Sequence, residues 1–475
     1  MIFNVPKENW KDLSDPIINK QYDKLFNGNF SIFSGYFEDK KNVYLFRDFL
    51  GVSTLFYRIN DSKIKINFNY DKLINPGDKI NKNGAYNFIF FGSSRFVELV
   101  ENIKICPPGS ILSYNKKDNN IKILYKHSII PDNLKNLNEN EILSIYNEKL
   151  SKAVNKNPYS GKKAIFMGGG IDAGCIASKI DNDLDAITAL PWGAKSSEKK
   201  ASLLNSKILK IKKHKFLEVG TKTFEAENLK NVYTMPLGSL NFLVINQMFK
   251  EGLLSDYSTF LFGQGADTLF CSAGSQSTSA LLPWFIRKIY LKESDPVNLF
   301  LKMTSGGILK NNSELINNLI PNNLTKVQRI IMAGLKITHT PVDSEYFIIP
   351  ALKNNKNIFN PYYDLEIIKF LMGYKKTITF DYSKRTRKFP FKFDKKLQRE
   401  LWELISNSKF TPNKKNFYLS SNFKPIKEFL NKTPVRVNGD KIKNENQRFA
   451  AYSLINFANQ NNLELDLEFK NNLFD

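Results

Sequence analysis

The first part of the chain alternates short apolar runs with polar turns, a pattern that predicts β-strands. Residues 30–37 form one such run, and after a polar turn residues 43–46 continue as the second strand of a hairpin. Further strands are predicted at residues 54–58, 63–68 and 111–114. The pattern therefore predicts a sheet-rich N-terminal part.

The pattern changes after a polar link at residues 131–138. Residues 141–155 place apolar side chains near helical spacing, and from about residue 163 short apolar runs alternate with helical stretches. That alternation is typical of βαβ units around a parallel sheet. We therefore expect two domains, residues 1–130 and 140–475, the second with α/β architecture.

One stretch of the second domain has a pattern suited to phosphate binding. An apolar run at 164–167 leads into Gly168, Gly169 and Gly170, and a helix follows with Asp172 near its start. Successive glycines allow backbone N–H groups to converge on an anion, and the N-terminus of the helix adds partial positive charge. Asp172 is placed to hold a magnesium ion on that phosphate. The alternative interpretation is a tight turn that only allows the helix to pack closely.

A second glycine-rich segment repeats this arrangement. Residues 259–262 form an apolar run before Gly263 and Gly265, and Asp267 follows. Because the carboxyl ends of parallel strands open onto one crevice, we expect Asp172 and Asp267 to face the same ligand. Two carboxylates suit a magnesium-pyrophosphate group. The alternative role for Asp267 is that of a helix N-cap.

These two motifs, in this order, resemble those of the synthetase domain of asparagine synthetases and their relatives, the β-lactam synthetases and lasso-peptide cyclases. The resemblance implies that the residues from Gly168 to Ala173 bind the pyrophosphate of ATP, and that residues 263–267 form the family's second loop. It also implies that the strand containing Thr188 helps to position the adenine.

Two downstream segments extend the resemblance. Residues 358–364 are similar to the family's aromatic-Pro-aromatic-aromatic-Asp segment. Residues 414–417 resemble its Lys-Lys-Gly-Phe stretch, which implies that Lys414 faces the acyl-adenylate. For this lysine-rich segment the alternative interpretation is a solvated loop.

The N-terminal part resembles the later half of the glutaminase domain that precedes the synthetase domain in this family. The resemblance rests on residues 27–33 and 45–57 and on the turn at 107–109. Ile2 stands where asparagine synthetases have a catalytic cysteine, and the earlier portion of that domain is not recognisable. The implied fold is α/β: a sheet-rich remnant of an Ntn-type glutaminase domain, unable to hydrolyse glutamine, followed by a parallel-sheet ATP-pyrophosphatase (synthetase) domain.

The sequence departs from the family's pattern within both loops. Gly168 replaces the usual leading serine, and Ala173-Gly174 replace hydroxyl residues, so that hydroxyl donors to pyrophosphate are lost. Gln264 stands where β-lactam synthetases have a tyrosine that helps to deprotonate their nucleophile. This difference argues against β-lactam formation.

The resemblance implies a biosynthetic carbon–nitrogen ligase that uses ATP and Mg²⁺. It would adenylate a small-molecule or peptide carboxylate and couple it to an amine, with a peptide or natural-product cyclase as one form. Asp172 and Asp267 would hold the metal, and Lys414 would stabilise charge as the amine displaces AMP. Two alternatives stay open: a non-catalytic relative that acts as a binding partner, and an adenylating enzyme directed at RNA.

Composition bears on which partners, metal sites and locations are expected. The net charge of +23 comes from 69 Lys+Arg against 46 Asp+Glu, but lysine is abundant from end to end, so that compositional bias is favoured over a nucleic-acid surface. Three scattered cysteines and three histidines argue against disulfides or a zinc site, and His214 is interpreted as a surface residue. No stretch approaches the ~20 apolar residues of a membrane span. We therefore expect a cytoplasmic protein, and leave a homo-oligomer open.

Overall fold

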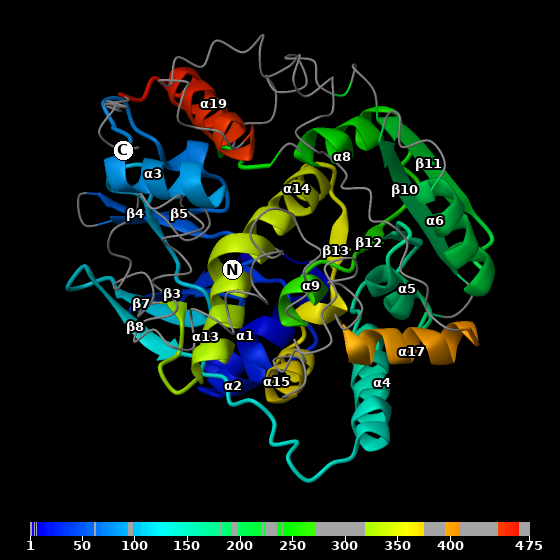
Figure 1. The fold of residues 1–475 in the computed structure, drawn as a ribbon. Coiled ribbons are helices and arrows are strands. Elements are labelled where there is room, and N and C mark those ends of the chain that lie inside the picture. The colour runs from blue at the N-terminus through cyan, green and yellow to red at the C-terminus, as the bar shows by residue number, and fades with distance from the viewer. Residues whose placement is uncertain are drawn as a thin grey trace.

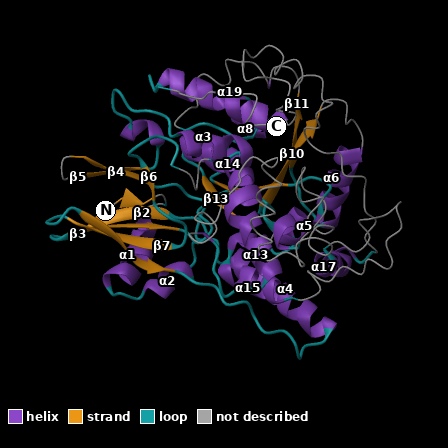
Figure 2. Cartoon of the chain, turned by 60° about the vertical axis from the view of Figure 1, so that its left-hand side comes forward, coloured by secondary structure: helices purple, strands orange, loops and turns teal. Residues whose placement is uncertain are grey.

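The computed structural model describes residues 2–3, 5, 7–60, 63–93, 98–180, 183–191, 197–219, 223, 235–239, 241–270, 319–374, 395–408 and 445–464. It is a mixed α/β structure with two antiparallel sheets in the N-terminal part and a five-stranded parallel sheet further along the chain. Figure 2 shows the antiparallel sheets on one side of the molecule and strands β10 and β11 of the parallel sheet on the other. The predicted α/β class is confirmed at this level.

The larger antiparallel sheet contains the predicted hairpin. Its order is β1-β2-β3-β7-β8, with bounds β1 (Ile2–Phe3), β2 (Ser34–Glu38), β3 (Asn42–Arg47), β7 (Ser110–Asn115) and β8 (Asn120–Lys126). In the hairpin, Tyr36 of β2 lies opposite Leu45 of β3. The smaller sheet, of order β5-β4-β6, consists of β4 (Phe56–Asn60), β5 (Lys63–Asn67) and β6 (Lys104–Ile105). The predicted N-terminal strands are thus confirmed.

Alternation along the strands builds a core on each face of the larger sheet. On one face a buried cluster joins the two sheets: Val43, Leu45, Leu55, Tyr57, Cys106, Leu112 and Tyr114. On the other face, Phe46 lies 6.2 Å from the ring of Phe33, which in turn lies 5.9 Å from the ring of Phe26. Phe26 belongs to helix α2 (Tyr22–Phe26), which follows α1 (Trp10–Ile18). These helices cover the sheet through apolar contacts.

The sequence analysis missed the helices of the N-terminal part. These are α1, α2 and α3 (Lys82–Phe91), together with the 3₁₀ turns η1 (Lys7–Asn9) and η2 (Tyr70–Leu73). Pro16 lies inside α1 and Gly84 inside α3, and both residue types are unfavourable in a helix interior. In α3, tertiary packing outweighs the low helix propensity of glycine. The segment at Glu98 packs so closely on α3 that any side chain at position 84 would overlap the carbonyl oxygen of Glu98.

A helix from the far end of the sequence packs against the N-terminal part. Helix α19 (Glu445–Gln460) lies beside α3 (Figure 1). The ring of Phe457 is 6.3 Å from that of Tyr70, and the N–H group of Ile80 donates to the carbonyl oxygen of Glu464 at 3.0 Å. The proposed division into residues 1–130 and 140–475 stays a prediction.

The second part of the chain forms the predicted parallel sheet. Its order is β11-β10-β9-β12-β13, with bounds β9 (Lys163–Phe166), β10 (Leu184–Pro191), β11 (His214–Val219), β12 (Thr259–Leu261) and β13 (Asn357–Phe359), all paired in parallel. From β9 the chain first builds outward through β10 and β11, and then returns to place β12 and β13 on the other side of β9. The switch point between β9 and β12 is where open α/β sheets bind ligands.

Helices alternate with these strands as the pattern predicts. Their bounds are α4 (Glu139–Asn155), α5 (Ile171–Ala177), α6 (Ser197–Ile208), α8 (Asn241–Lys250), α9 (Ala266–Leu269), α13 (Lys326–Ala333), the π-helical turn η5 (Gly334–Thr338), α14 (His339–Lys353), the 3₁₀ turn η6 (Pro361–Tyr363), α15 (Leu365–Gly373) and α17 (Lys396–Ser406). The predicted helix at 141–155 is confirmed as α4. It begins earlier than predicted because Asn138 and Glu141 form a capping box.

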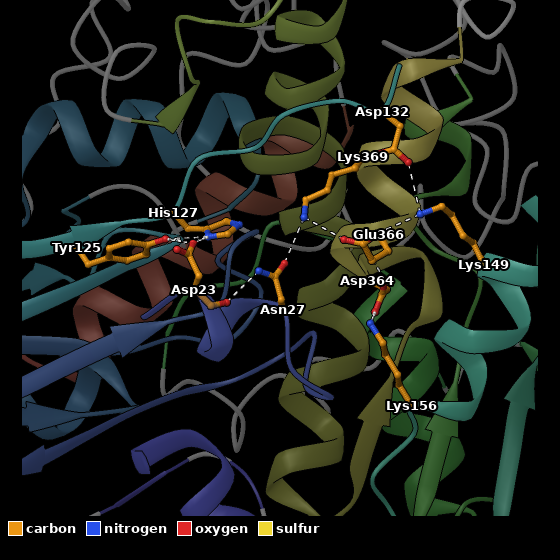
Figure 3. Close-up of polar contacts among 10 residues, drawn as sticks. All are labelled: Asp23, Asn27, Tyr125, His127, Asp132, Lys149, Lys156, Asp364, Glu366 and Lys369. Atoms are coloured by element: carbon orange, nitrogen blue, oxygen red, sulfur yellow. Dashed lines mark hydrogen bonds and ion pairs between the residues drawn. The ribbon is translucent and has the colours of Figure 1, made fainter. Parts of the chain in front are cut away.

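Polar contacts connect α2, α15 and α4 (Figure 3). Lys369 of α15 donates to the side-chain oxygen of Asn27 at 3.3 Å and pairs with Glu366 at 3.0 Å. Lys149 of α4 pairs with Glu366 at 3.1 Å and with Asp132 at 3.4 Å. Single pairs of this kind contribute little, but together they fix α15 between the other two helices.

Among the described residues, none of the helices combines the length and the apolar character that a membrane span requires.

Candidate functional site

Two glycine loops meet at the switch point of the parallel sheet. The first follows β9 and leads into α5, and the second follows β12 and leads into α9. Gly263 lies so close to α5 that a Cβ there would be 2.8 Å from the nitrogen of Ala173 and 3.0 Å from the Cβ of Asp172. Gly265 has a φ of 88°, a left-handed conformation that glycine tolerates. The contact between the loops therefore requires glycine at 263, and the backbone conformation favours glycine at 265.

Asp172 and Asp267 converge on one ammonium group. The Nζ atom of Lys395 lies 2.5 Å from Oδ2 of Asp172 and also contacts Oδ1 of Asp267. The lysine side chain is 6% exposed, whereas those of Asp172 and Asp267 are 19% and 25% exposed. The structure thus brings the two predicted aspartates together, at a lysine that the sequence analysis did not identify.

The two carboxylates stabilise the charge of Lys395. Burial lowers the pKa of this lysine, but the charges of Asp172 and Asp267 and their hydrogen bonds outweigh burial, so that the pKa of Lys395 lies above its usual value. Lys395 directly precedes α17, and its backbone is left-handed, with φ 54° and ψ 40°. This conformation costs a non-glycine residue about 1–2 kcal/mol. The ion pairs with both aspartates offset that strain.

Helix α6 supports the first loop. The N–H group of Gly169 donates to Oε1 of Glu198 at 2.7 Å, and the side-chain amide of Asn205 donates to the carbonyl oxygens of Gly168 at 3.2 Å and Gly170 at 3.4 Å. A Cβ on Gly169 would lie 2.5 Å from a side-chain atom of α6, whereas a Cβ on Gly170 would meet nothing within 4 Å. The Gly169 amide thus already binds an anionic oxygen, and Gly170 faces open space.

Helix α17 packs on α5 at Gly174. A Cβ on Gly174 would lie 2.5 Å from Cζ3 of Trp402, a side chain of α17 that is 4% exposed. The indole ring occupies the space that any side chain at position 174 would need. Figure 1 shows α17 lying against α5. The glycine noted in the sequence therefore has a packing cause.

A buried chain of hydrogen bonds links α4, α17 and the first loop. The hydroxyl of Tyr146 donates to the side-chain oxygen of Gln398, and the amide of Gln398 donates to the hydroxyl of Tyr362. Tyr362 in turn donates to the carbonyl oxygen of Asp172 at 3.1 Å. These three side chains are fully buried. Because each is satisfied, the chain fixes α17 relative to Asp172.

Thr188 uses its hydroxyl inside the sheet. The hydroxyl donates to the carbonyl oxygen of Met167 and lies 2.7 Å from Nε2 of His214, whose Nδ1 lies 2.8 Å from the hydroxyl of Ser206. Burial lowers the pKa of His214 to about 4. Neutral His214 therefore carries its proton on Nε2, donates to Thr188 and accepts from Ser206. His214 is half-buried rather than freely exposed, and both of its ring nitrogens contact hydroxyl groups of neighbouring elements.

The residue between the two glycines of the second loop contacts α14. The side-chain amide of Gln264 donates to the hydroxyl of Tyr346, and the amide of Asn360 donates to the carbonyl oxygen of Gln264 at 2.8 Å. A tyrosine hydroxyl thus lies beside position 264, supplied by a helix 82 residues further along the chain. No pattern in the sequence indicates this long-range contact.

Asp172 and Asp267 are the two carboxylates at the switch point that could hold a metal ion, provided that Lys395 gives up its contacts with them. Among the described residues there is no cluster of three or more His, Cys, Asp or Glu side chains that could hold a metal ion. Proteins often bind Mg²⁺ through one or two carboxylates, with substrate phosphates and water completing the shell. Asp172 and Asp267 supply that smaller set.

Most of the predicted site residues lie at this switch point: Gly168, Gly169, Gly170, Asp172, Ala173, Gly263, Gly265 and Asp267. Lys414, predicted to face an acyl-adenylate, lies outside the described residues. Lys395 was missed because the sequence does not distinguish it from Lys396. Which of the two faces the aspartates depends on how α17 begins.

The strand order and the two loops define an α/β protein whose two glycine loops meet at the switch point of a five-stranded parallel sheet, the position at which open α/β sheets bind ligands. Compared with protein-family models and with curated proteins, the chain matches none of them.

Proposed function

We propose that this chain is an ATP-dependent synthetase that forms amide bonds, activating a carboxylate as its adenylate and coupling it to an amine without hydrolysing glutamine. One observation carries the proposal: Asp172 and Asp267 converge on Lys395 at the carboxyl ends of the adjacent strands β9 and β12. Ligands of open α/β sheets bind at this position. The choice of adenylation rests on the resemblance to the asparagine synthetase family.

In this proposal the two loops hold the nucleotide phosphates. Gly170 borders open space, and the neighbouring Gly169 N–H group already donates to a carboxylate oxygen of Glu198, which is chemically similar to a phosphate oxygen. Asp172 and Asp267 would hold Mg²⁺, which when bound neutralises charge on pyrophosphate. The loop thus supplies hydrogen-bond donors, and the aspartates supply the metal ligands.

The proposed reaction has two steps. In the first, a carboxylate oxygen of the substrate attacks the α-phosphorus, and the bond to the bridging oxygen breaks to release pyrophosphate. Lys395, buried and positively charged, lies where it can stabilise the departing negative charge. In the second, an amine attacks the acyl carbon, loses a proton and releases AMP, and Lys414 is proposed to stabilise the charge on that acyl-adenylate.

The N-terminal sheets are proposed to be the truncated, inactive glutaminase-like domain. Arg47 is fully buried and donates to the carbonyl oxygens of Ser53 at 2.6 Å and Cys106 at 2.9 Å, while the Asp48 carboxylate accepts two backbone N–H groups. Both side chains therefore stabilise a turn and its packing. The proposal assigns no glutamine hydrolysis to this domain and takes the amine from a substrate.

A non-catalytic relative is the second candidate, and one observation favours it. The Trp402 ring against Gly174 fills the space where a side-chain donor to pyrophosphate would stand. In such a protein the switch point would serve to bind a partner rather than to process ATP.

Calorimetric titration with Mg²⁺·ATP tests the proposal without knowledge of the substrate. We expect the wild-type protein to bind and Asp267→Asn to lose about tenfold or more in affinity, equivalent to at least ~1.4 kcal/mol. Asp256→Asn is the matched control, because the Asp256 side chain is 54% exposed and pairs with Lys215 away from the loops. It should bind as the wild type does.

Binding would justify a screen of carboxylates for ATP–pyrophosphate exchange, the reaction that reports adenylate formation. No binding by the wild-type protein at millimolar ATP would contradict the synthetase and favour the non-catalytic relative.

A further inference from the structure

The ammonium of Lys395 occupies the position that a divalent cation bound by both aspartates would need. Its Nζ atom lies 2.5 Å from Oδ2 of Asp172 and contacts Oδ1 of Asp267. Mg²⁺ binds carboxylate oxygens at about 2.0–2.1 Å, so that the ion and the ammonium cannot share both carboxylates without strong repulsion between like charges. The lysine and the cation therefore compete for one site.

Lys395 cannot simply release the aspartates. Its side chain is 6% exposed, and a buried ammonium without an anionic partner is strongly destabilised. Another anion must replace the carboxylates as its partner. Beside the aspartates, the first loop opens to solvent at Gly170, where a Cβ would meet nothing within 4 Å, so that a phosphate group could approach from this side.

The helix that carries Lys395 is fixed in place. Gln398 is hydrogen-bonded to Tyr146 and Tyr362, and Trp402 is packed on Gly174. Any exchange of partners must therefore occur through rotation of the flexible lysine side chain, and not through displacement of α17.

We propose that Lys395 closes the metal site by pairing with Asp172 and Asp267, and opens it when a phosphate oxygen takes over its ammonium, so that the divalent cation and the nucleotide bind as a coupled pair. This inference rests on the proposed function, because the phosphate is taken to be that of ATP. It adds a positive linkage: the cation strengthens nucleotide binding, and the nucleotide strengthens cation binding by the same factor.

The coupling can be tested with Mn²⁺ alone, whose free concentration is measured by electron paramagnetic resonance. Without nucleotide, Lys395→Met should bind Mn²⁺ about tenfold or more tightly than the wild type, because the ammonium that competes with the cation for the two carboxylates is removed. Lys396→Met is the matched control: Lys396 is the adjacent residue, pairs with Glu139 and Glu400, and is 43% exposed. It should leave Mn²⁺ binding unchanged. Lys395→Arg keeps the positive charge and should bind Mn²⁺ weakly, as the wild type does.

A second measurement uses the wild-type protein and does not depend on how the variants fold. The affinity for α,β-methylene-ATP, which cannot release pyrophosphate, is measured by calorimetry in EDTA and in saturating Mg²⁺. We expect the cation to raise this affinity about tenfold or more. Equal affinity in the two buffers would overturn the coupling and leave nucleotide binding itself intact. Tight Mn²⁺ binding by the wild type without nucleotide, unchanged in Lys395→Met, would also overturn it. If the analogue does not bind in either buffer, both the coupling and the proposed function fail.

Discussion

Gly263 and Gly170 stand in the two glycine loops at the switch point of the parallel sheet, yet they are glycines for different reasons. A Cβ at Gly263 would press against the backbone of α5, whereas a Cβ at Gly170 would enter open space. Backbone atoms cannot rotate away as the end of a flexible side chain can. The loops can therefore approach each other only if position 263 has no side chain.

This difference predicts unequal costs for the same substitution. Gly263→Ala should lower the free energy of unfolding by about 1–3 kcal/mol, since the two loops must separate. Gly170→Ala, the control, should cost less than ~1 kcal/mol, the effect expected of an exposed alanine in place of glycine at a helix N-cap. Urea unfolding followed by circular dichroism measures both. Equal costs would show that the contact at Gly263 does not limit the packing of the loops.

The sequence predicts the place of a single residue where a recognisable strand and a glycine-rich turn come directly before it. Asp172 and Asp267 each follow a strand and glycines, so their placement at the carboxyl ends of parallel strands could be predicted. Lys395 and Tyr346 have no such signal, because they reach the switch point from helices that are distant in sequence. The use of Thr188 within the sheet was also not predictable, since it depends on the position of His214 on the neighbouring strand.

Helix α17 and the residue before it contact both the two aspartates and the buried side chains that pack behind them. Lys395 at its start pairs with the aspartates, Gln398 one turn later joins the buried hydrogen bonds, and Trp402 after another turn packs on Gly174. These residues recur at helical spacing along one face. The helix therefore contacts α5 along its length, and the contact depends on a small residue in α5.

A double-mutant cycle tests this contact between helices. Gly174→Ser in the wild-type background should destabilise the protein by about 1–3 kcal/mol, because the new side chain overlaps the indole ring. In a Trp402→Leu background the same substitution should cost about 1–2 kcal/mol less, a coupling typical of residues in contact.

Leu404→Ala is the control background, since Leu404 lies on the same helix but is 67% exposed. There, Gly174→Ser should cost as much as in the wild type. A cost of Gly174→Ser that is the same in all three backgrounds would contradict the packing explanation for this glycine.

Elements with strong local patterns were predicted well, and those fixed by packing were not. The hairpin of β2 and β3, the parallel strands and α4 follow from alternation, apolar runs and helical spacing. Helices α1 and α3 contain Pro16 and Gly84, so propensity argues against them, and their burial against the sheets decides the outcome.

For the whole molecule, a buried neutral histidine makes stability depend on pH. The side chain of His127, which directly follows β8, is 4% exposed, and its ring stacks on Phe26 at 5.0 Å. Burial lowers the pKa of His127 to about 4, although the nearby Asp23 carboxylate opposes this shift. The unfolded chain, with a histidine pKa of about 6.5, takes up the proton first as the pH falls. Stability is therefore lost progressively below about pH 6.5, until the folded protein is also protonated near pH 4.

Because of His127, we expect the unfolding free energy of the wild type to fall by about 1–2 kcal/mol when the pH is lowered from 7 to 5. His127→Phe keeps the aromatic stacking and removes the titration, so it should lose less stability over the same range. His214 is present in both proteins, and its contribution cancels in the comparison. Urea unfolding at the two pH values gives the difference, and parallel losses in both proteins would exclude His127 as the cause.

The net charge of +23 bears on the open alternative of an RNA-directed enzyme. Filter binding to unstructured RNA at low and physiological salt tests it, since binding through phosphates weakens steeply as salt rises. The expected result is no binding at low salt, in line with lysines spread along the chain rather than gathered in one motif.

The packing of α19 on the N-terminal sheets has a consequence for how the chain folds during synthesis on the ribosome. Tyr70 and Ile80 leave the exit tunnel long before Phe457 and Glu464, the residues that cover them. Until then, apolar surface around α3 and the smaller sheet is exposed to solvent, and contacts between such distant residues form slowly. Chaperone binding to nascent chains is therefore expected to last until the residues of α19 have emerged.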